Sequence, residues 1–437
     1  MARCNDFGKR TRLGAADTEM RIAIIGAGVS GLVCAHALHP EHEITVFEAD
    51  ARPGGHANTV HVETESGVYD IDTGFIVFND RNYPNFERLL DELGVATQPS
   101  DMSFGVSDGE DFEYNGASPN GLFAVRRHML APSFRTMIAD LLRFNRDARD
   151  LLNSDEDPSL RQWLEQRSYS RAFIERLIVP QASAVWSADP GQMWSFPARF
   201  LLEFFDNHGM LGFTNRPRWR TVTGGSQRYV EALIAPWRER IRLSTPVTRV
   251  IRQPDHVELT ARGSEPERFD AVVFATHSDE ALALLSDPGE LENELLGSIP
   301  YQRNVATLHT DRSLLPRRRR AWASWNYHLV AAKTGRATVT YHMNRLQALR
   351  ADREFCLTLN RTEAIDPEQI IATFQYDHPV YTPLGLAAQA RHQEISGHNR
   401  THYCGAYWGW GFHEDGVRSA LRVARELGAA KALPVSV

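Results

Sequence analysis

The most constraining feature of this chain is the segment 21–56, whose pattern fits a dinucleotide-binding unit. An apolar run leads into the glycine turn 26–31, a helix-compatible stretch follows, and a second apolar run ends at Glu48. Strand, glycine turn, helix, strand and acid in this order are typical of a Rossmann-like unit. The segment therefore predicts an α/β domain that holds a nucleotide at the end of its first strand.

The glycines of this turn each have a physical role in that prediction. Gly26 permits the tight turn, Gly28 lets backbone N–H groups approach a pyrophosphate, and Gly31 lets helix and strand pack closely. The helix that follows offers the positive end of its dipole to the phosphates. Glu48, 22 residues after Gly26, is placed to accept hydrogen bonds from a ribose 2′-hydroxyl and to repel a 2′-phosphate, which disfavours NADP. The alternative is an ordinary glycine-rich turn in an α/β domain.

The residues after Glu48 favour FAD over NAD. The string 48–56, Glu-Ala-Asp-Ala-Arg-Pro-Gly-Gly-His, resembles the extended fingerprint of the flavin amine oxidase and phytoene desaturase superfamily. This resemblance implies that the acid, the basic residue and the paired glycines line the pyrophosphate of FAD. His56 stands where members of the superfamily usually carry arginine, and this departure weakens the case for an amine oxidase.

A second region with the same resemblance lies near the end of the chain. Residues 402–420 resemble the closing flavin motif of the superfamily, in which a strand and a loop precede a helix whose N-terminus faces the isoalloxazine. The resemblance also implies that Val247 pairs its backbone with the adenine of FAD. The expected cofactor-binding residues are Gly26, Ala27, Gly28, Val29, Ser30, Gly31, Glu48, Ala49, Arg52, Gly54, Gly55, His56, Asp72, Thr73, Gly74, Val247, Ala275, Gly405, Glu414, Asp415, Gly416 and Val417.

The middle of the chain narrows the resemblance further. The strings 179–190, 196–197, 207–211 and 217–226 resemble a bacterial group of FAD-binding oxidoreductases that are often encoded beside cyclopropane-fatty-acyl-phospholipid synthases. The match runs from Met20 nearly to the end of the chain. It implies a lipid acyl substrate and a fatty-acid synthase-type partner enzyme.

The length of 437 residues favours two intertwined domains. We expect a Rossmann-like FAD-binding domain with an inserted α+β substrate domain and a disordered extension before both. The predicted boundaries are 1–19 for the extension, 20–80, 215–290 and 395–437 for the FAD-binding domain, and 81–214 and 291–394 for the substrate domain.

Within the substrate domain, periodicity predicts both helices and strands. Residues 122–152 form a long, basic, amphipathic helical pattern that is interrupted near Pro132. Alternating apolar residues predict four strands of one sheet, at 303–310, 323–328, 337–344 and 355–360.

Composition excludes several other classes of protein. The net charge of -7 argues against a nucleic-acid-binding surface. No apolar run approaches the roughly 18 residues that a membrane-spanning helix needs. The four cysteines are scattered without metal-ligand spacing, which indicates a reducing, cytoplasmic compartment and no metal site.

Flavin oxidations require an apolar slot that aligns a substrate C–H bond, exclusion of water and stabilisation of charge. The candidate catalytic residues are Asp72, Tyr327, His328 and Phe412, with Phe75, Trp325, Asn326 and Tyr341 as further walls. Phe412 falls where amine oxidases place one aromatic side chain of the cage around the substrate. The alternatives are that the aromatic residues fill the core, that Asp72 satisfies backbone N–H groups of a turn, and that His328 is a hydrogen-bonded sheet residue.

Lysine and cysteine positions bear on the substrate and on the cofactor linkage. Amine oxidases of the superfamily usually bridge a lysine through water to flavin N5, and among three lysines the plausible candidate is Lys333, in a turn. An amine substrate is therefore disfavoured. Cys404 enters the closing motif on the phosphate side by analogy, so we expect FAD to be bound without a covalent link.

Basic residues around the predicted helix 122–152 raise the possibility of a membrane surface. Arginines alternate there with apolar residues, and 317–320 is a run of four arginines. Such a surface could rest on the anionic inner face of a membrane and admit an acyl chain. The alternative is an amphipathic helix packed on its own domain. The arginines of the helix are Arg126, Arg127, Arg135, Arg143, Arg146 and Arg149.

The sequence as a whole predicts an FAD-dependent oxidoreductase that transfers a hydride from a lipid acyl chain, methylated or cyclopropanated, to the flavin. Two alternatives are an amine oxidase and a flavin-binding accessory subunit that delivers lipid to a synthase without redox chemistry.

Overall fold

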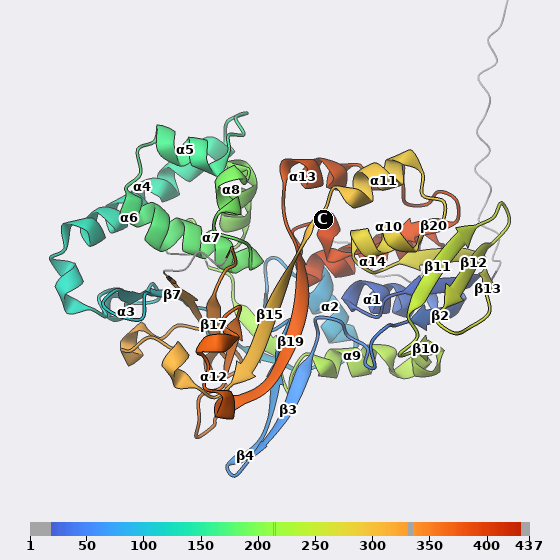
Figure 1. Ribbon diagram of the computed structural model, residues 1–437, viewed down its shortest axis with the longest axis horizontal. Coiled ribbons are helices and arrows are strands. Elements are labelled where there is room, and N and C mark those ends of the chain that lie inside the picture. The colour runs from blue at the N-terminus through green and yellow to red at the C-terminus, as the bar shows by residue number, and fades with distance from the viewer. Residues whose placement is uncertain (1–18, 213, 215, 331–334, 430–437) are drawn as a thin grey trace, which may run out of the picture.

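The computed structural model describes most of the chain and places two sheets side by side (Figure 1). The predicted extension, apart from Glu19, and the lysine candidate Lys333 lie outside the described residues. The described residues are 19–212, 214, 216–330 and 335–429.

A five-stranded parallel sheet forms the half of the molecule drawn on the right of Figure 1. Its strands come from all three segments predicted for the FAD-binding domain. In spatial order they are β10 (Ile241–Arg242), β2 (Glu43–Phe47), β1 (Arg21–Ile25), β14 (Ala271–Phe274) and β20 (Thr401–Tyr403).

Both faces of this sheet are covered, as the apolar sequence of β1 requires. Ile22 and Ile24 pack into a cluster with the helices of one face, whereas Ala23 and Ile25 pack into a second cluster on the other face. The first face carries α1 (Val29–Leu38), α9 (Gln227–Ile234) and α14 (His413–Glu426). The second carries the antiparallel sheet of β11 (Val247–Arg252), β12 (Val257–Ala261) and β13 (Glu267–Phe269), with α10 (Ser278–Leu284) and α11 (Glu290–Gly297). The predicted Rossmann-like half is confirmed.

A seven-stranded sheet forms the centre of the other half. Its strands pair antiparallel, except that β16 and β7 run parallel. The four predicted strands are confirmed and lie together in this sheet as β15, β16, β17 and β18. The spatial order is β19 (Ile370–Pro379), β15 (Tyr301–His309), β18 (Cys356–Leu359), β17 (Val339–His342), β16 (Trp325–His328), β7 (Phe104–Ser107) and β8 (Glu113–Asn115).

Helices gather at the outer end of this half, away from the parallel sheet (Figure 1). The predicted basic helical region is confirmed, with α3 (Pro119–Leu122), η1 (Arg126–Met129) and α4 (Pro132–Leu152) in succession. The break falls where Pro132 starts α4, because proline lacks an N–H but fits the first helical turn. The other helices are α5 (Leu160–Gln166), α6 (Arg171–Phe173), the π-helix Ile174–Ile178, α7 (Val179–Trp186) and α8 (Ala198–Asn207).

Smaller elements connect the two halves. The hairpin of β3 (Thr59–Thr64) and β4 (Gly67–Asp72) is followed by the sheet of β5 (Phe78–Asn79), β9 (Trp219–Val222) and β6 (Thr97–Pro99). The remaining helices are α2 (Pro84–Glu92), α12 (Met343–Leu346) and α13 (Pro383–Ala390). Within the described ranges, no helix combines the length and the apolar character needed to cross a bilayer.

Candidate functional site

A cavity of about 1000 Å³ is lined by residues of both halves of the molecule. At one end its wall is the glycine turn after β1, with Gly26, Gly28 and Val29. At the other end the wall is made by α7, α8 and strands of the seven-stranded sheet, including Trp186, Phe204 and Trp325. A volume of this size is at the upper end of the range for ligand pockets, so this cavity is the candidate functional site.

The glycine turn has the geometry that its sequence predicts. Gly26 has a φ of +101°, and a Cβ there would lie 2.8 Å from the carbonyl oxygen of Ala275. A Cβ at Gly31 would lie 1.9 Å from the carbonyl oxygen of Gly26, so α1 packs directly on the turn. A Cβ at Gly28 would meet no atom within 4 Å. The backbone at Gly28 is therefore open to the cavity at the N-terminus of α1.

Glu48 lies on the cavity wall and holds the turn in place. Its Oε2 accepts a hydrogen bond from the Ala27 N–H at 2.7 Å, and its Oε1 accepts one from the Asp50 N–H at 2.9 Å. Burial raises the pKa of Glu48, and these backbone N–H groups oppose that shift. Each carboxylate oxygen has more than one lone pair, so Glu48 can also accept from a ligand hydroxyl.

The paired glycines lie against the same turn. The Gly54 N–H donates to the carbonyl oxygen of Ala27 at 2.7 Å, and a Cβ at Gly55 would lie 3.1 Å from the Cα of Gly28. The guanidinium of Arg52 donates to the carbonyl oxygen of Gly55 at 2.8 Å. Arg52 therefore braces this loop from the cavity wall.

His56 follows the paired glycines and also lines the cavity. Its ring centroid lies 4.9 Å from that of Tyr376 and 5.4 Å from that of His378, both on β19. Burial lowers the pKa of His56 well below its usual value, and His378 and His277 lower it further. The loop from β2 and the substrate-domain strand β19 thus meet at this imidazole.

The predicted cofactor-binding residues divide into two groups in the structure. Those on the cavity wall are Gly26, Gly28, Val29, Ser30, Glu48, Ala49, Arg52, Gly55, His56, Thr73, Gly74, Val247, Ala275 and Gly405. Those behind the wall are Ala27, Gly31, Gly54, Asp72, Glu414, Asp415, Gly416 and Val417. The second group shapes the wall through packing and hydrogen bonds.

Asp72, predicted as a catalytic and cofactor-binding residue, is fully buried behind the wall. Its Oδ1 accepts from the Thr59 hydroxyl at 2.7 Å and from the N–H and hydroxyl of Ser226 at 2.8 and 2.7 Å. Its Oδ2 accepts from Gln347 Nε2 at 3.1 Å. Burial raises the pKa of Asp72 to about 7 against these hydrogen bonds. Asp72 therefore joins three segments of the chain and does not face the cavity; its partners are mostly side chains distant in sequence and not the N–H groups of a local turn.

The two acids of the closing motif also bind backbone N–H groups. Glu414 accepts from the N–H groups of Asn85 and Phe86 at 3.1 and 2.9 Å, at the N-terminus of α2. Asp415 accepts from the N–H groups of Trp410 and Phe412 at 3.0 and 3.1 Å, and burial raises its pKa to about 6. These acids hold the loop before α14, whose first residue, His413, lines the cavity.

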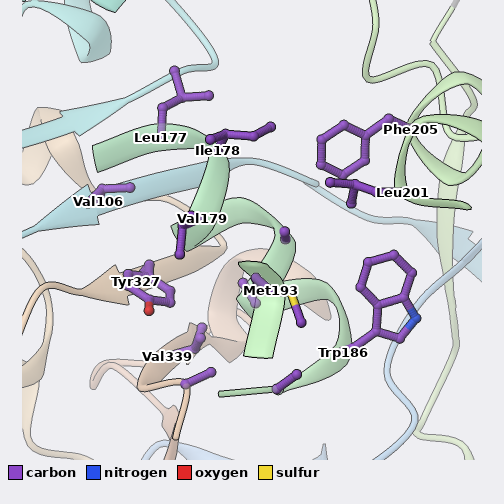
Figure 2. Close-up of a cluster of buried hydrophobic side chains, with 14 of the residues drawn as sticks. Val106, Leu177, Ile178, Val179, Trp186, Met193, Leu201, Phe205, Tyr327 and Val339 are labelled. Carbon is purple, nitrogen blue, oxygen red and sulfur yellow. The ribbon is translucent and has the colours of Figure 1, made fainter. Parts of the chain in front are cut away.

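Tyr327 and His328, predicted as catalytic, lie away from the cavity wall. Tyr327 packs among apolar side chains that include Val179 and Val339 (Figure 2). His328 bonds through Nε2 to the Thr340 hydroxyl at 2.8 Å and accepts from Arg361 at Nδ1 at 3.0 Å. Burial lowers the pKa of His328 to about 3. Both side chains are therefore packed inside the protein, because β17 and α7 cover this end of β16.

Phe412, Phe75, Trp325 and Tyr341 do line the cavity, whereas Asn326 does not. The rings of Trp325 and Tyr341 meet edge to face at 5.0 Å. Several other residues of this wall were not predicted from the sequence as site residues. They are Trp186, Phe204, His208, Met210, Tyr376, His378 and Tyr381.

The cysteine that directly follows β20 lies apart from the cavity. Cys404 is buried beside Cys34 of α1, and both are free thiols. Cys404 does not appear on the cavity wall within the described part of the chain. This position gives Cys404 no contact with a group in the cavity.

The family described as flavin containing amine oxidoreductase matches residues 29–334. Protoporphyrinogen oxidase 2 of Arabidopsis thaliana is 27% identical over 188 residues, 40% of this chain and 35% of that protein. The mitochondrial protoporphyrinogen oxidase of Nicotiana tabacum is 24% identical over 303 residues, 58% of this chain and 57% of that protein. The matches thus span between one third and two thirds of these relatives' lengths.

Solved structures share the fold over almost the whole chain. Cyclohexylamine oxidase from Brevibacterium oxydans aligns with a TM-score of 0.67 and 17% identity, over 94% of this chain and 100% of that chain. A putative protoporphyrinogen oxidase from Exiguobacterium aligns with a TM-score of 0.68 and 18% identity, over 94% and 99%. A CLA-producing fatty acid isomerase from P. acnes aligns with a TM-score of 0.65 and 17% identity, over 93% and 98%. At these identities the likeness shows the fold alone.

Proposed function

The chain belongs to the flavin containing amine oxidoreductase family, and from this membership we propose that it is an oxidoreductase that binds FAD non-covalently and oxidises a lipid acyl substrate. The cavity wall supports FAD as the cofactor. The open backbone at Gly28 and the N-terminus of α1 fit the phosphates, and Glu48 fits a ribose hydroxyl. When bound, FAD supplies a two-electron acceptor for a hydride from the substrate.

We base the proposal of a lipid acyl substrate on the apolar wall of the cavity in the substrate domain. Side chains of α7, α8 and the seven-stranded sheet form this wall, with Trp325, Leu357 and Phe374 among them. His208 is also on the wall, and burial lowers its pKa to about 4, so this imidazole is neutral at pH 7. Such a surface excludes water and packs against a hydrocarbon chain.

An amine substrate is the second candidate, and the family and the fold shared with cyclohexylamine oxidase favour it. An ammonium group requires a carboxylate or an aromatic cage. Among the described residues, Asp377 is the carboxylate that the seven-stranded sheet contributes to the cavity wall, and it pairs with Arg303 at 3.3 Å. This carboxylate is therefore already paired, whereas aromatic side chains of the wall such as Trp325 and Phe412 suit either substrate, so the flavin-reduction experiment decides between the two.

We further propose a peripheral membrane contact at the tip formed by η1. Leu130 is 82% exposed and Met129 is 51% exposed, beside the exposed side chains of Arg126 and Arg127. The apolar face of α4 itself packs into the domain core, with Phe134, Met137 and Phe144 buried. Helix α4 is therefore an amphipathic helix packed on its own domain, and the proposed contact is limited to residues 126–130. Exposed apolar side chains beside arginines suit an anionic lipid surface.

The experiment that tests the function is anaerobic mixing of the flavin-loaded protein with phospholipids that carry unsaturated, methylated or cyclopropanated chains. Reduction by the substrate would bleach the visible absorbance of the oxidised flavin. The variant Trp325→Leu alters the cavity wall and should change the bleaching rate. The control Trp194→Leu changes a tryptophan that stacks under Arg161 away from the cavity, and it should leave the rate unchanged.

Three results would contradict the lipid proposal in different ways. Bleaching by cyclohexylamine or a polyamine, with no response to any lipid, would favour the amine oxidase. An oxidised flavin with every lipid and every amine would favour the accessory subunit. A folded protein that binds no FAD would remove the oxidoreductase function itself.

A further inference from the structure

The cavity wall carries more acidic than permanently basic side chains among the described residues. Among the described residues on the wall, Arg52 is the one permanent cation, and it faces four carboxylates. The carboxylates are Glu48, Asp50, Glu280 and Asp377. Two phosphate charges added to this wall would raise its negative charge further, so a second cation beside Arg52 would strengthen their binding.

Arg52 already uses two of its N–H donors within the protein. Its Nη1 donates to the carbonyl oxygen of Ala57 at 3.2 Å and its Nη2 to that of Gly55 at 2.8 Å. The N-terminus of α1 contributes a partial positive charge, about half an elementary charge. The remaining groups on the wall that can become cations are the five histidines His56, His208, His277, His378 and His413.

Hydrogen-bond partners restrain two of these histidines, and the partner of His378 fixes its ring in the neutral form. His378 Nδ1 accepts from Asn304 Nδ2 at 2.8 Å. The amide of Asn304 is held in this orientation because its Oδ1 accepts from Asn360 Nδ2 at 2.8 Å, and Asn360 Oδ1 accepts from the Val305 N–H at 3.0 Å. Protonation of His378 at Nδ1 would break this series of hydrogen bonds. Burial accordingly lowers the pKa of His378 to about 4.

His413 is restrained as well. Its ring stacks on Phe75 with centroids 3.5 Å apart, and its Nε2 bonds with the Tyr229 hydroxyl at 3.0 Å. Burial lowers the pKa of His413 to about 3. His208 lies in the apolar part of the wall, bonded to the carbonyl oxygen of Phe204 at 2.9 Å.

His56 differs from His208, His378 and His413 in position and in bonding. It directly follows Gly55, which packs against Gly28 at the N-terminus of α1. Within the described part of the chain, neither ring nitrogen of His56 has a hydrogen-bond partner, so both are available to a ligand in the cavity. The titratable and charged groups that act on it come from four elements. They are Arg52 in its own loop, His277 before α10, His378 on β19 and His413 on α14.

We propose that His56 takes up one proton from solvent when the phosphates of FAD bind, so that an imidazolium faces the dinucleotide. This inference rests on the proposed function only in taking FAD as the cofactor. In the absence of the phosphates, burial keeps the pKa of His56 well below its usual value and the ring neutral. Phosphate oxygens would raise this pKa, because an opposite charge nearby favours the charged form.

The proposal gives the sign of a pH dependence. A group whose pKa is higher in the complex than in the free protein strengthens binding below the pKa of the complex. Between the two pKa values, the dissociation constant of FAD rises with pH by up to about tenfold per pH unit. Above the pKa of the complex, the dissociation constant no longer depends on this proton.

The test is titration of flavin-free protein with FAD between about pH 5.5 and pH 8.5. Quenching of flavin fluorescence gives the dissociation constant, and calorimetry in buffers of different ionisation enthalpy gives the number of protons taken up. The wild type should take up a proton and bind FAD more weakly as pH rises. His56→Arg supplies a permanent cation and should bind FAD with no proton uptake at this site. His56→Gln should bind more weakly at low pH and also lose the uptake.

The control is His61→Gln, which replaces an exposed histidine of β3 off the cavity wall. This variant should keep the proton uptake of the wild type. Adenosine diphosphate ribose carries the same pyrophosphate diester without the flavin ring, and it should cause the same uptake as FAD. FAD binding without proton uptake in the wild type, or unchanged uptake in both His56 variants, would overturn the proposal. Failure of the wild type to bind FAD would instead contradict the proposed function.

Discussion

The packing of α1 on the glycine turn predicts a large effect for Gly31→Ala. A Cβ at Gly31 would lie 1.9 Å from the Gly26 carbonyl oxygen and 3.1 Å from the Cβ of Ala275. Real Cβ atoms essentially never approach other atoms closer than 3.0 Å, so α1 would have to move by about 1 Å. Both obstacles belong to the turn and to the end of β14, which are themselves packed in the core.

The expected magnitude is the difference between two effects. Alanine in a helix stabilises by about 1 kcal/mol relative to glycine. Overpacking a core contact costs roughly 1–3 kcal/mol. Because the contact at Gly31 is backbone on backbone and cannot relax by a side-chain rotation, the upper part of that range applies. The free energy of unfolding should fall by about 1–2 kcal/mol. The displaced N-terminus of α1 should also weaken FAD binding about five- to tenfold.

The assays are urea unfolding and titration of flavin-free protein with FAD. Gly297→Ala is the matched control, since Gly297 ends helix α11 and the nearest atom to its Cβ position, in the Leu282 side chain, is 3.7 Å away. The control should be neutral or slightly stabilising and should bind FAD like the wild type. If Gly31→Ala gained stability as much as Gly297→Ala and kept the wild-type affinity, the packing of α1 on the turn would be refuted.

Three further substitutions test other parts of the molecule. Burial raises the pKa of Asp72 to about 7, so as pH rises the carboxyl loses its proton in the unfolded chain before it does in the folded protein. The free energy of unfolding should therefore fall by up to about 4 kcal/mol between about pH 4 and about pH 7. In urea unfolding, Asp72→Asn should remove this dependence on pH. Glu48→Gln should raise the dissociation constant of FAD about tenfold, measured by flavin fluorescence, since a charged acceptor is lost. Replacing Met129 and Leu130 by serine should lower co-sedimentation with anionic vesicles at low salt, whereas equal sedimentation would contradict the membrane contact.

The nucleotide end of the cavity could be predicted because its residues are contiguous in sequence. One glycine turn and one acid specify where backbone N–H groups and a carboxylate lie, since the turn, α1 and β2 are built from local geometry. The spacing from Gly26 to Glu48 therefore placed both on one cavity wall. Four of the seven strands of the substrate-domain sheet could be predicted for the same local reason.

The substrate wall could not be predicted in the same way, because its residues come together only through the packing of distant segments. Trp186 ends α7, Phe204 lies on α8, and Tyr381 follows β19. The alternation of residues along β19, which places Tyr376 and His378 on one face, is the sequence signal that predicts these two wall residues.

Asp72, Glu414 and Asp415 show why motif residues near a cofactor need not touch it. Each is a buried carboxylate, yet each binds backbone N–H groups of a segment distant in sequence or of an adjoining loop. A buried acid is costly unless its oxygens are satisfied, so these hydrogen bonds fix the positions of the loops that carry them. The loops in turn carry the residues that do line the cavity, such as Thr73 and Phe412. Substitution of these acids should therefore alter flavin binding through the shape of the wall, with an accompanying loss of stability that a direct ligand contact would not produce.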